Sequence, residues 1–89
     1  MKYAVHITER ALYDLGRMDK NIARRIVDKL TFFESTGEPL CYAKKLNDSI
    51  YGTYRFRIGE YRAIFDIDAK GEICILMILR VKHRKDVYR

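Results

Sequence analysis

Two periods of hydrophobicity divide the chain into a helical first part and a strand-rich second part. Residues 2–7 place apolar side chains at every second position, as a half-buried strand does. Residues 20–35 instead repeat them at the three- and four-residue spacing of an amphipathic helix. The apolar positions of this second segment are Ile22, Ile26, Leu30 and Phe33. A strand followed by helical structure is therefore predicted for the first 35 residues.

Polar residues indicate where the helices begin and end. Thr8 can act as the N-cap of a first helix, and Glu9 then lies in the first turn, where the helix dipole favours a negative charge. Asp19 can cap the second helix in the same way. Gly37 and Pro39 follow in the order expected after a helix end. Two helices separated by a short break are predicted.

The second half of the chain predicts three further strands. Residues 51–58 and 61–67 alternate in hydrophobicity, and Gly59-Glu60 between them favours a tight hairpin. Residues 72–81 are almost continuously apolar, which is typical of a strand at the centre of a covered sheet. Residues 40–49 are interpreted as a polar connection.

The order β-α-α-β-β-β predicts an α+β fold, with two helices packed on one face of a mostly antiparallel four-stranded sheet. Residues 1–89 form a single domain, because a chain of this length holds one hydrophobic core. The N-terminus lacks the apolar segment of a signal peptide, and the longest apolar run is too short to span a bilayer. We therefore expect a cytoplasmic protein with no membrane partner.

The charge distribution indicates an anionic partner. The formal net charge is +6 and the isoelectric point is about 9.5, which favours nucleic acid, the ribosome, an acidic protein or an anionic membrane surface. Strand alternation places many of the cations on the sheet face opposite the helices, which is expected to be uncovered, with His83, Arg84 and Tyr88 at its edge. The cations that alternation places on this face are Arg55, Arg57, Arg62, Arg80 and Lys82. Because neighbouring like charges repel, a bound phosphate is expected; the alternative is a solvated face of arginine stems.

Residue types argue against a metal site. A metal nuclease needs a cluster of carboxylates, whereas Asp66 alone shares the parity of these cations in the strand interiors. Cys41 and Cys74 match neither a zinc pattern nor a redox pair. Lys44 and Lys45 are interpreted as part of a solvated loop. The tyrosines are expected to pack in the core or at sheet edges rather than to stack on bases, namely Tyr3, Tyr13, Tyr51, Tyr54 and Tyr61.

Two segments carry a family resemblance. YRFRIGEYRAIF, residues 54–65, followed by VKHRKDVY, residues 81–88, resembles the RelE branch of the RelE/ParE toxin superfamily. The resemblance extends over essentially the whole chain. It implies the toxin of a bacterial or archaeal type II toxin–antitoxin system, an endoribonuclease that cuts messenger RNA in the ribosomal A site. Implied partners are a cognate antitoxin, mRNA and the ribosome, and neither a metal nor an organic cofactor is implied.

The resemblance also assigns roles to residues. RNA is cut when its 2′-hydroxyl attacks the adjacent phosphate, so the protein orients the strand, stabilises charge and assists proton transfer. The RNA-binding set is Arg55, Arg57, Arg80 and Lys82, where Arg80 joins by its parity, and the catalytic set is His83, Arg62, Arg84 and Tyr88. The family has lysines where Arg55 and Arg57 stand, and arginine cannot act as a base. Histidine titrates near neutrality, so His83 is the predicted proton acceptor.

Alternatives remain open at this point. Water or the ribosome could take the proton while arginines alone stabilise the transition state. A ParE-like poison of DNA gyrase would have the same fold, although chains of that type generally lack the tail containing His83, Arg84 and Tyr88. An inactive RNA- or antitoxin-binding module is a third possibility, because arginines replace the family's lysines.

Overall fold

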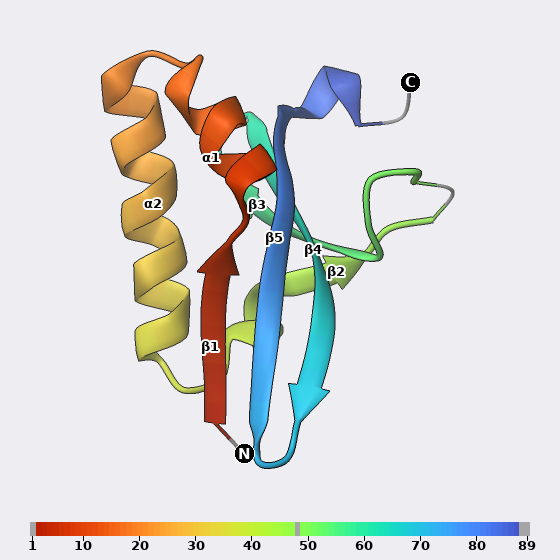
Figure 1. The fold of residues 1–89 in the computed structure, drawn as a ribbon. Coiled ribbons are helices and arrows are strands. Elements are labelled where there is room, and N and C mark those ends of the chain that lie inside the picture. The colour runs from red at the N-terminus through yellow and green to blue at the C-terminus, as the bar shows by residue number, and fades with distance from the viewer. Residues whose placement is uncertain (1, 48, 88–89) are drawn as a thin grey trace.

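In the computed structural model, the described residues, 2–47 and 49–87, form two α-helices and a five-stranded sheet (Figure 1). The elements in chain order are β1 (Lys2–Ile7), α1 (Glu9–Gly16), α2 (Lys20–Ser35), the 3-10 turn η1 (Pro39–Tyr42), β2 (Ala43–Lys45), β3 (Tyr54–Ile58), β4 (Tyr61–Lys70), β5 (Ile73–His83) and the 3-10 turn η2 (Arg84–Asp86). The predicted α+β fold is confirmed. The predicted number of four strands was wrong by one.

The last strand lies between the first strand and the hairpins. The strand order is β1-β5-β4-β3-β2, in which β1 pairs with β5 in parallel and the other neighbours are antiparallel. This arrangement confirms the mostly antiparallel sheet and explains the continuous apolar sequence of β5, which has a neighbour on each side and helices over one face.

The additional strand, β2, comes from the segment that was interpreted as a polar connection. Its three residues pair with β3, so that Lys44 lies opposite Arg55. A three-residue strand is too short to show an alternation of its own, and its pairing depends on the edge that β3 offers. Lys44 therefore belongs to the sheet and not to a solvated loop.

Both helices begin and end where the capping residues indicated. The Thr8 side chain accepts a hydrogen bond from the Ala11 N–H at 3.4 Å, and that of Asp19 accepts from the Asn21 N–H at 2.8 Å. Thr8 also donates its hydroxyl to the Ile78 carbonyl at 2.7 Å, which ties the start of α1 to β5.

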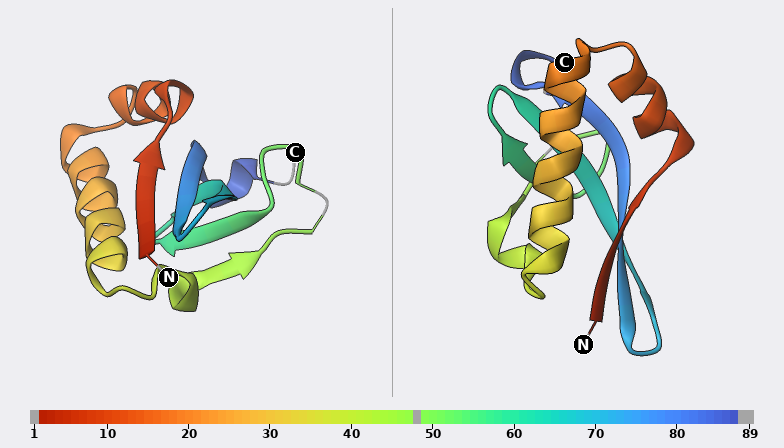
Figure 2. Two further views of the ribbon diagram at one scale, coloured as in Figure 1. Left: turned by 60° about the horizontal axis from the view of Figure 1, so that its bottom comes forward. Right: turned by 90° about the vertical axis from the view of Figure 1, so that its left-hand side faces the viewer.

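The two helices cover the same face of the sheet. Leu15 of α1 and Leu30 of α2 belong to one buried core with residues of β3, β4 and β5. Within it, Phe33 of α2 stacks on Phe56 at 4.8 Å between ring centroids, and Phe56 stacks on Phe65 at 4.5 Å. The right view of Figure 2 shows α2 in front of the sheet. The predicted placement of both helices on one face is confirmed.

A β-bulge reverses the alternation of side chains in β5. Arg80 pairs with Ile64, whereas Ile78 pairs with the next residue of β4, so Leu79 is the extra residue. Strict alternation from Ile78 would have turned Arg80 toward the helices. The bulge instead directs Val81 into the core and Arg80 to the other face.

The face opposite the helices, here called the outer face, is partly covered. Ile64 is fully buried there in a second small apolar cluster with Leu46 and Val87, and Tyr51 packs against it. Gly52 permits this close approach, because a Cβ at Gly52 would lie only 2.8 Å from Cγ2 of Ile64. In the left view of Figure 2, η2 and the connection between β2 and β3 lie across the sheet from α2. The expectation of a wholly uncovered outer face was therefore wrong.

Candidate nucleic-acid interface

Cations occupy paired positions in two rows that run across the strands of the outer face. The first row consists of Arg57 on β3, Arg62 on β4 and Lys82 on β5, each directly opposite the next. The second row contains Lys44, Arg55, Ile64 and Arg80, and again each residue is paired with the next one on the adjacent strand. The sheet thus brings together the five strand cations predicted from parity and adds Lys44. We call these six side chains the cationic face.

Arg80 is held by a carboxylate from the helical layer. Asp14 of α1 accepts hydrogen bonds from Nε of Arg80 at 2.8 Å, from Nη2 of Arg80 at 3.2 Å and from the Val81 N–H at 3.0 Å. The two side chains are only 12% and 19% exposed, respectively. This contact fastens α1 to the part of β5 that extends beyond Ile78, its last pair with β1. Arg80 is therefore part of a structural ion pair.

The Asp14 carboxyl is adapted to this contact. Burial raises its pKa, but the hydrogen bonds from Arg80 and Val81 and the nearby charges of Arg80 and Lys82 together hold the pKa below its ordinary value. The same carboxylate raises the pKa of Arg80. The pair is thus fully ionised at neutral pH.

Tyr51 connects two members of the cationic face. Its ring centroid lies 5.3 Å from Cζ of Arg80 and 4.7 Å from Nζ of Lys82, within the range of cation–π attraction. Sequence reasoning expected Tyr51 to pack in the core or at a sheet edge, and its contact with the small buried cluster around Ile64 confirms that it packs against a core. The contact with the cations was missed, because no local pattern relates residue 51 to residues 80 and 82.

The arginine in the tail is oriented by the turn between β3 and β4. Nε of Arg84 lies 2.6 Å from Oε2 of Glu60, and the Arg84 N–H donates to the Glu60 carbonyl at 2.8 Å. Both side chains are more than half exposed. Arg84 thus lies at an edge of the sheet, as expected. Tyr88 lies outside the described residues, and its catalytic role remains a prediction.

His83 lies on the helix side of the sheet. It pairs with Tyr61, which packs against the core, and the two rings meet edge to face at 5.4 Å between centroids. Nδ1 of His83 accepts a hydrogen bond from the Lys85 N–H at 3.2 Å. A neutral imidazole that accepts at Nδ1 carries its hydrogen on Nε2, so Nε2 can donate but cannot accept a proton. The sheet also separates this ring from the row of Arg57 and Arg62.

Within residues 2–47 and 49–87, no group of three or more His, Cys, Asp or Glu side chains could hold a metal ion. In the same residues, no helix is long and apolar enough to cross a membrane.

One tyrosine departs from its expected packing, because Tyr13 of α1 is 55% exposed and lies at the surface.

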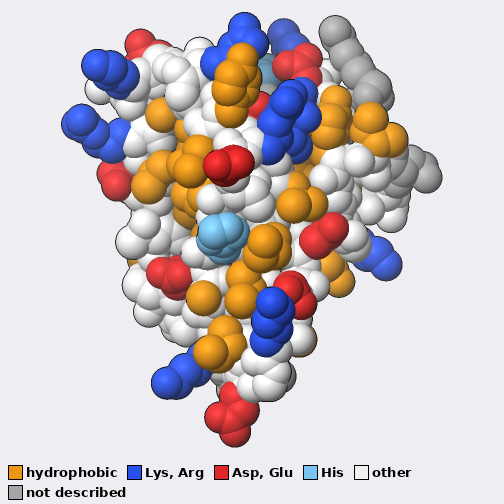
Figure 3. Space-filling model, in the orientation of Figure 1, with side chains coloured by type: hydrophobic (Ala, Val, Ile, Leu, Met, Phe, Trp, Pro, Cys, Tyr) orange, Lys and Arg blue, Asp and Glu red, His pale blue; other side chains and the backbone are white. Residues whose placement is uncertain are grey.

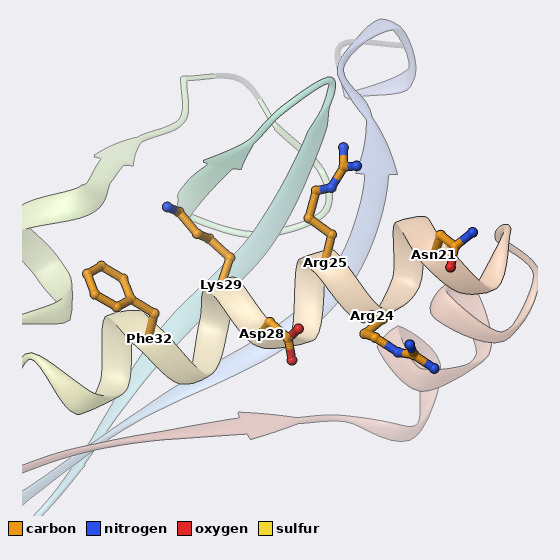
Figure 4. Close-up of a pocket in the computed structure, with 6 residues that line it drawn as sticks. All are labelled: Asn21, Arg24, Arg25, Asp28, Lys29 and Phe32. Atoms are coloured by element: carbon orange, nitrogen blue, oxygen red, sulfur yellow. The ribbon is translucent and has the colours of Figure 1, made fainter.

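A second group of charged side chains lies on the outward face of α2. A shallow hollow of about 450 Å³ is lined by Asn21, Arg24, Arg25, Asp28, Lys29 and Phe32. In Figure 4, Arg25 and Lys29 extend to one side of the helix, and Arg24 and Asp28 to the other. No residue of the cationic face lines this hollow, since α2 covers the opposite face of the sheet.

A small α+β domain with two helices on one face of its sheet and cations on the other fits the toxins of type II toxin–antitoxin systems. The profile of a family described as "ParE toxin of type II toxin-antitoxin system, parDE" matches residues 5–88. The chain therefore belongs to the RelE/ParE toxin family of type II toxin–antitoxin systems. The predicted family resemblance is confirmed.

Individual relatives come from the RelE side of this family. The protein Toxin RelG of Mycobacterium tuberculosis is 37% identical over 89 residues, which cover 100% of this chain and 99% of that protein. A chain of the toxin–antitoxin complex RelBE2 from the same organism superposes with a TM-score of 0.68 at 32% identity, covering 94% of this chain and 100% of that chain. A chain of the archaeal RelE–RelB complex of Pyrococcus horikoshii superposes with a TM-score of 0.65 at 25% identity, covering 97% and 99%.

Proposed function

We propose that this toxin is a metal-independent endoribonuclease that cleaves messenger RNA in the ribosomal A site, with the RNA backbone bound along the cationic face. The observation that carries the proposal is the first row, in which Arg57, Arg62 and Lys82 stand at paired positions on three adjacent strands. Like charges so arranged repel one another, and a phosphate placed between them removes that cost. The family of the chain and its net charge of +6 support the same reading.

The chemistry follows from the residue types. When the 2′-hydroxyl attacks the adjacent phosphate, negative charge increases on the phosphoryl oxygens, and the leaving 5′-oxygen must gain a proton. Arg62, at the centre of the first row, donates from Nη1 to the Gly59 and Tyr61 carbonyls at 3.4 Å and 3.1 Å, and its planar donors would turn to those phosphoryl oxygens when RNA binds. Arg84, held by Glu60 at the sheet edge, would contact a neighbouring phosphate.

The second part of the mechanism is the acceptor of the 2′-hydroxyl proton. The capping hydrogen bond at Nδ1 of His83 makes Nε2 a donor, so His83 would have to give up this contact before it could act as the predicted base. We therefore propose that the arginines supply the catalysis by stabilising charge, while water or the ribosome takes the 2′-hydroxyl proton and water gives a proton to the leaving 5′-oxygen as its bond to phosphorus breaks. Substitution of His83, described in the Discussion, distinguishes the two mechanisms.

We also propose a cognate antitoxin as the protein partner. The solved structures from M. tuberculosis, P. horikoshii and Methanococcus jannaschii are toxin–antitoxin complexes; a chain of the last superposes with a TM-score of 0.57 at 25% identity. An acidic, partly disordered antitoxin that folds over the cationic face would neutralise it and raise the melting temperature. Purification from the native operon without a bound small protein would contradict this proposal.

The family description keeps one alternative in view, since it names ParE toxins. In that case the same fold would inhibit a topoisomerase and would leave RNA intact. The two functions share the toxin's ability to stop growth, so growth inhibition alone cannot separate them.

One experiment tests the proposal against this alternative. The purified protein is added to translating ribosomes, the 5′ ends of the mRNA are mapped, and DNA supercoiling by gyrase is measured in parallel. New 5′ ends at A-site codons are expected with the wild-type chain and not with Arg57→Ala/Arg62→Ala. Lys70→Ala, an exposed cation at the far end of β4, is the matched control and should cleave normally. Intact mRNA together with inhibited supercoiling would overturn the proposal.

A further inference from the structure

A second hollow lies beside the cationic face, between α1 and the end of β5. It has a volume of about 480 Å³, and its lining includes Arg10, Tyr13, Arg17, Tyr61, Lys82 and His83. The hollow exists because β1 stops pairing at Ile78, so the last residues of β5 border on α1 instead of another strand. Figure 3 shows lysine, arginine and hydrophobic side chains mixed at the upper end of the molecule, where α1 and the end of β5 lie.

Aromatic rings stand on two sides of this hollow. Tyr13 projects from α1 with more than half of its surface exposed. Its ring centroid lies 5.7 Å from Cζ of Arg10 and 5.8 Å from Cζ of Arg17, which stand three residues before and four after it on one helix stripe. Across the hollow, the ring of His83 meets that of Tyr61 edge to face. Exposed tyrosine and arginine planes are the surfaces on which nucleic-acid bases stack.

The charges that line the hollow leave an excess of cations. Asp14 and Arg80 lie at its inner wall and neutralise each other in their ion pair. The remaining charged residues of the lining are Arg10, Arg17, Lys82 and Asp86. Three cations therefore face one carboxylate, which attracts a phosphate group. Aromatic walls and excess positive charge together suit a single-stranded nucleotide.

The hollow continues the first row of the cationic face. Lys82 is the last member of that row on β5, and it also lines the hollow. We propose that the hollow binds a nucleotide flanking the cleaved bond, with its base stacked beside Tyr13 and its phosphate on Arg17 or Arg10. This inference rests on the proposed function, because it takes the RNA strand to lie along Arg57, Arg62 and Lys82. It adds a subsite that lies on the other side of the edge of β5 from the first row.

A short fluorescent RNA tests the subsite directly. The probe is an eight-nucleotide single strand, 2′-O-methylated throughout so that 2′-hydroxyl attack is impossible, with 2-aminopurine placed at one position at a time. We expect strong quenching of the fluorophore at one position, where it stacks in the hollow. Tyr13→Ala should abolish this quenching and weaken binding about tenfold, whereas Tyr13→Phe should retain both.

A matched substitution on α2 supplies the control. Phe32 is 49% exposed and has Nζ of Lys29 at 5.3 Å from its ring centroid, which is the same kind of surface aromatic as Tyr13. Phe32→Ala should leave quenching and affinity unchanged. Unchanged binding of Tyr13→Ala, or an equal loss in Phe32→Ala, would overturn the subsite. Thermal melts of each variant exclude unfolding as the cause.

The same probe separates failure of the subsite from failure of the proposed function. Arg62→Ala should weaken binding of the probe, whichever position carries the fluorophore. If Arg62→Ala weakens binding and Tyr13→Ala does not, the hollow alone is excluded. If the wild-type protein does not bind the probe at low salt, the subsite is excluded, and cleavage of mRNA on ribosomes still decides the proposed function. Position-specific quenching in a protein that leaves mRNA intact on ribosomes would keep the subsite and remove the ribonuclease.

Discussion

The two rows of the outer face begin from similar residues and differ in what surrounds them. In the first row every paired position on β3, β4 and β5 is a cation. The second row is interrupted by Ile64, which is buried beneath the loop that carries Gly52, and it ends at Arg80, whose charge is matched by Asp14. The second row therefore contributes to stability, and our proposal places the RNA on the first row. The alternation of side chains along the strands does not by itself reveal this difference between the rows.

The largest expected effect falls on the centre of the first row. Arg62→Ala should reduce mRNA cleavage on ribosomes by about 10²-fold or more, because it removes a donor to charge that develops in the transition state. The melting temperature should change little, since Arg62 lies on the outer face and contributes nothing to the apolar core. Arg55→Ala, in the second row, should cost less. Equal losses in both variants would remove the distinction between the rows.

The ion pair of the second row should instead determine stability. Asp14→Asn should lower the free energy of unfolding by about 2 kcal/mol, because it weakens charged hydrogen bonds to Arg80 and to the backbone of Val81. Asp28→Asn, an exposed carboxylate on α2, is the matched control and should change stability by less than about 0.5 kcal/mol. Urea denaturation at pH 7 measures both.

The contribution of Asp14 should disappear in acid. Its pKa in the folded protein lies below the ordinary value, so its stabilisation is complete above the unfolded pKa, about 3.9, and is lost as the pH falls through the folded value. The difference in unfolding free energy between the wild type and Asp14→Asn should therefore shrink below about pH 4. If this difference stayed constant down to pH 2, the stabilisation by Asp14 would not depend on the charge of its carboxylate.

The salt dependence of RNA binding offers a finer comparison of the rows. Arg57→Ala should flatten the slope of log K against log salt by about one unit, as expected for one phosphate contact. Arg80→Ala should change that slope less, because its charge is already matched by Asp14. Binding is measured with a 2′-O-methyl RNA between low and physiological salt. The opposite ranking would place the RNA on the second row.

The smallest effect is expected at His83. His83→Gln should retain cleavage within about tenfold of the wild type, because the cap at Nδ1 leaves no acceptor nitrogen and the ring lies on the helix side of the sheet. Single-turnover cleavage on ribosomes, followed as a function of pH, gives the comparison. A loss of about 10²-fold together with an altered pH profile would instead identify His83 as the base.

The features that were predictable from the sequence depend on nearby residues. Thr8 and Asp19 cap their helices through backbone groups two or three positions away, so their residue types and positions are sufficient to locate the starts of both helices. Arg55 and Arg57 share a face because they stand two residues apart in one strand, and Gly59 adopts a φ of 60° in the short turn that pairs β3 with β4. Short-range geometry of this kind is the same in almost any fold.

Tertiary structure decided the features that depend on distant partners. The bulge at Leu79 lies where β5 stays paired with β4 but leaves β1 and meets α1 on its other side, and it reverses the face of Arg80. The ion pair of Arg80 with Asp14 joins residues 66 positions apart, and β2 exists only against the edge of β3. His83 was expected beside the arginines, but its pairing with Tyr61 places it on the helix side. The sequence alone determined that Arg55 and Arg57 of β3 would share one sheet face, since alternation along one strand is local. Only the folded chain decided that Arg80 meets a carboxylate, because that contact joins α1 to β5, which lie far apart in the sequence.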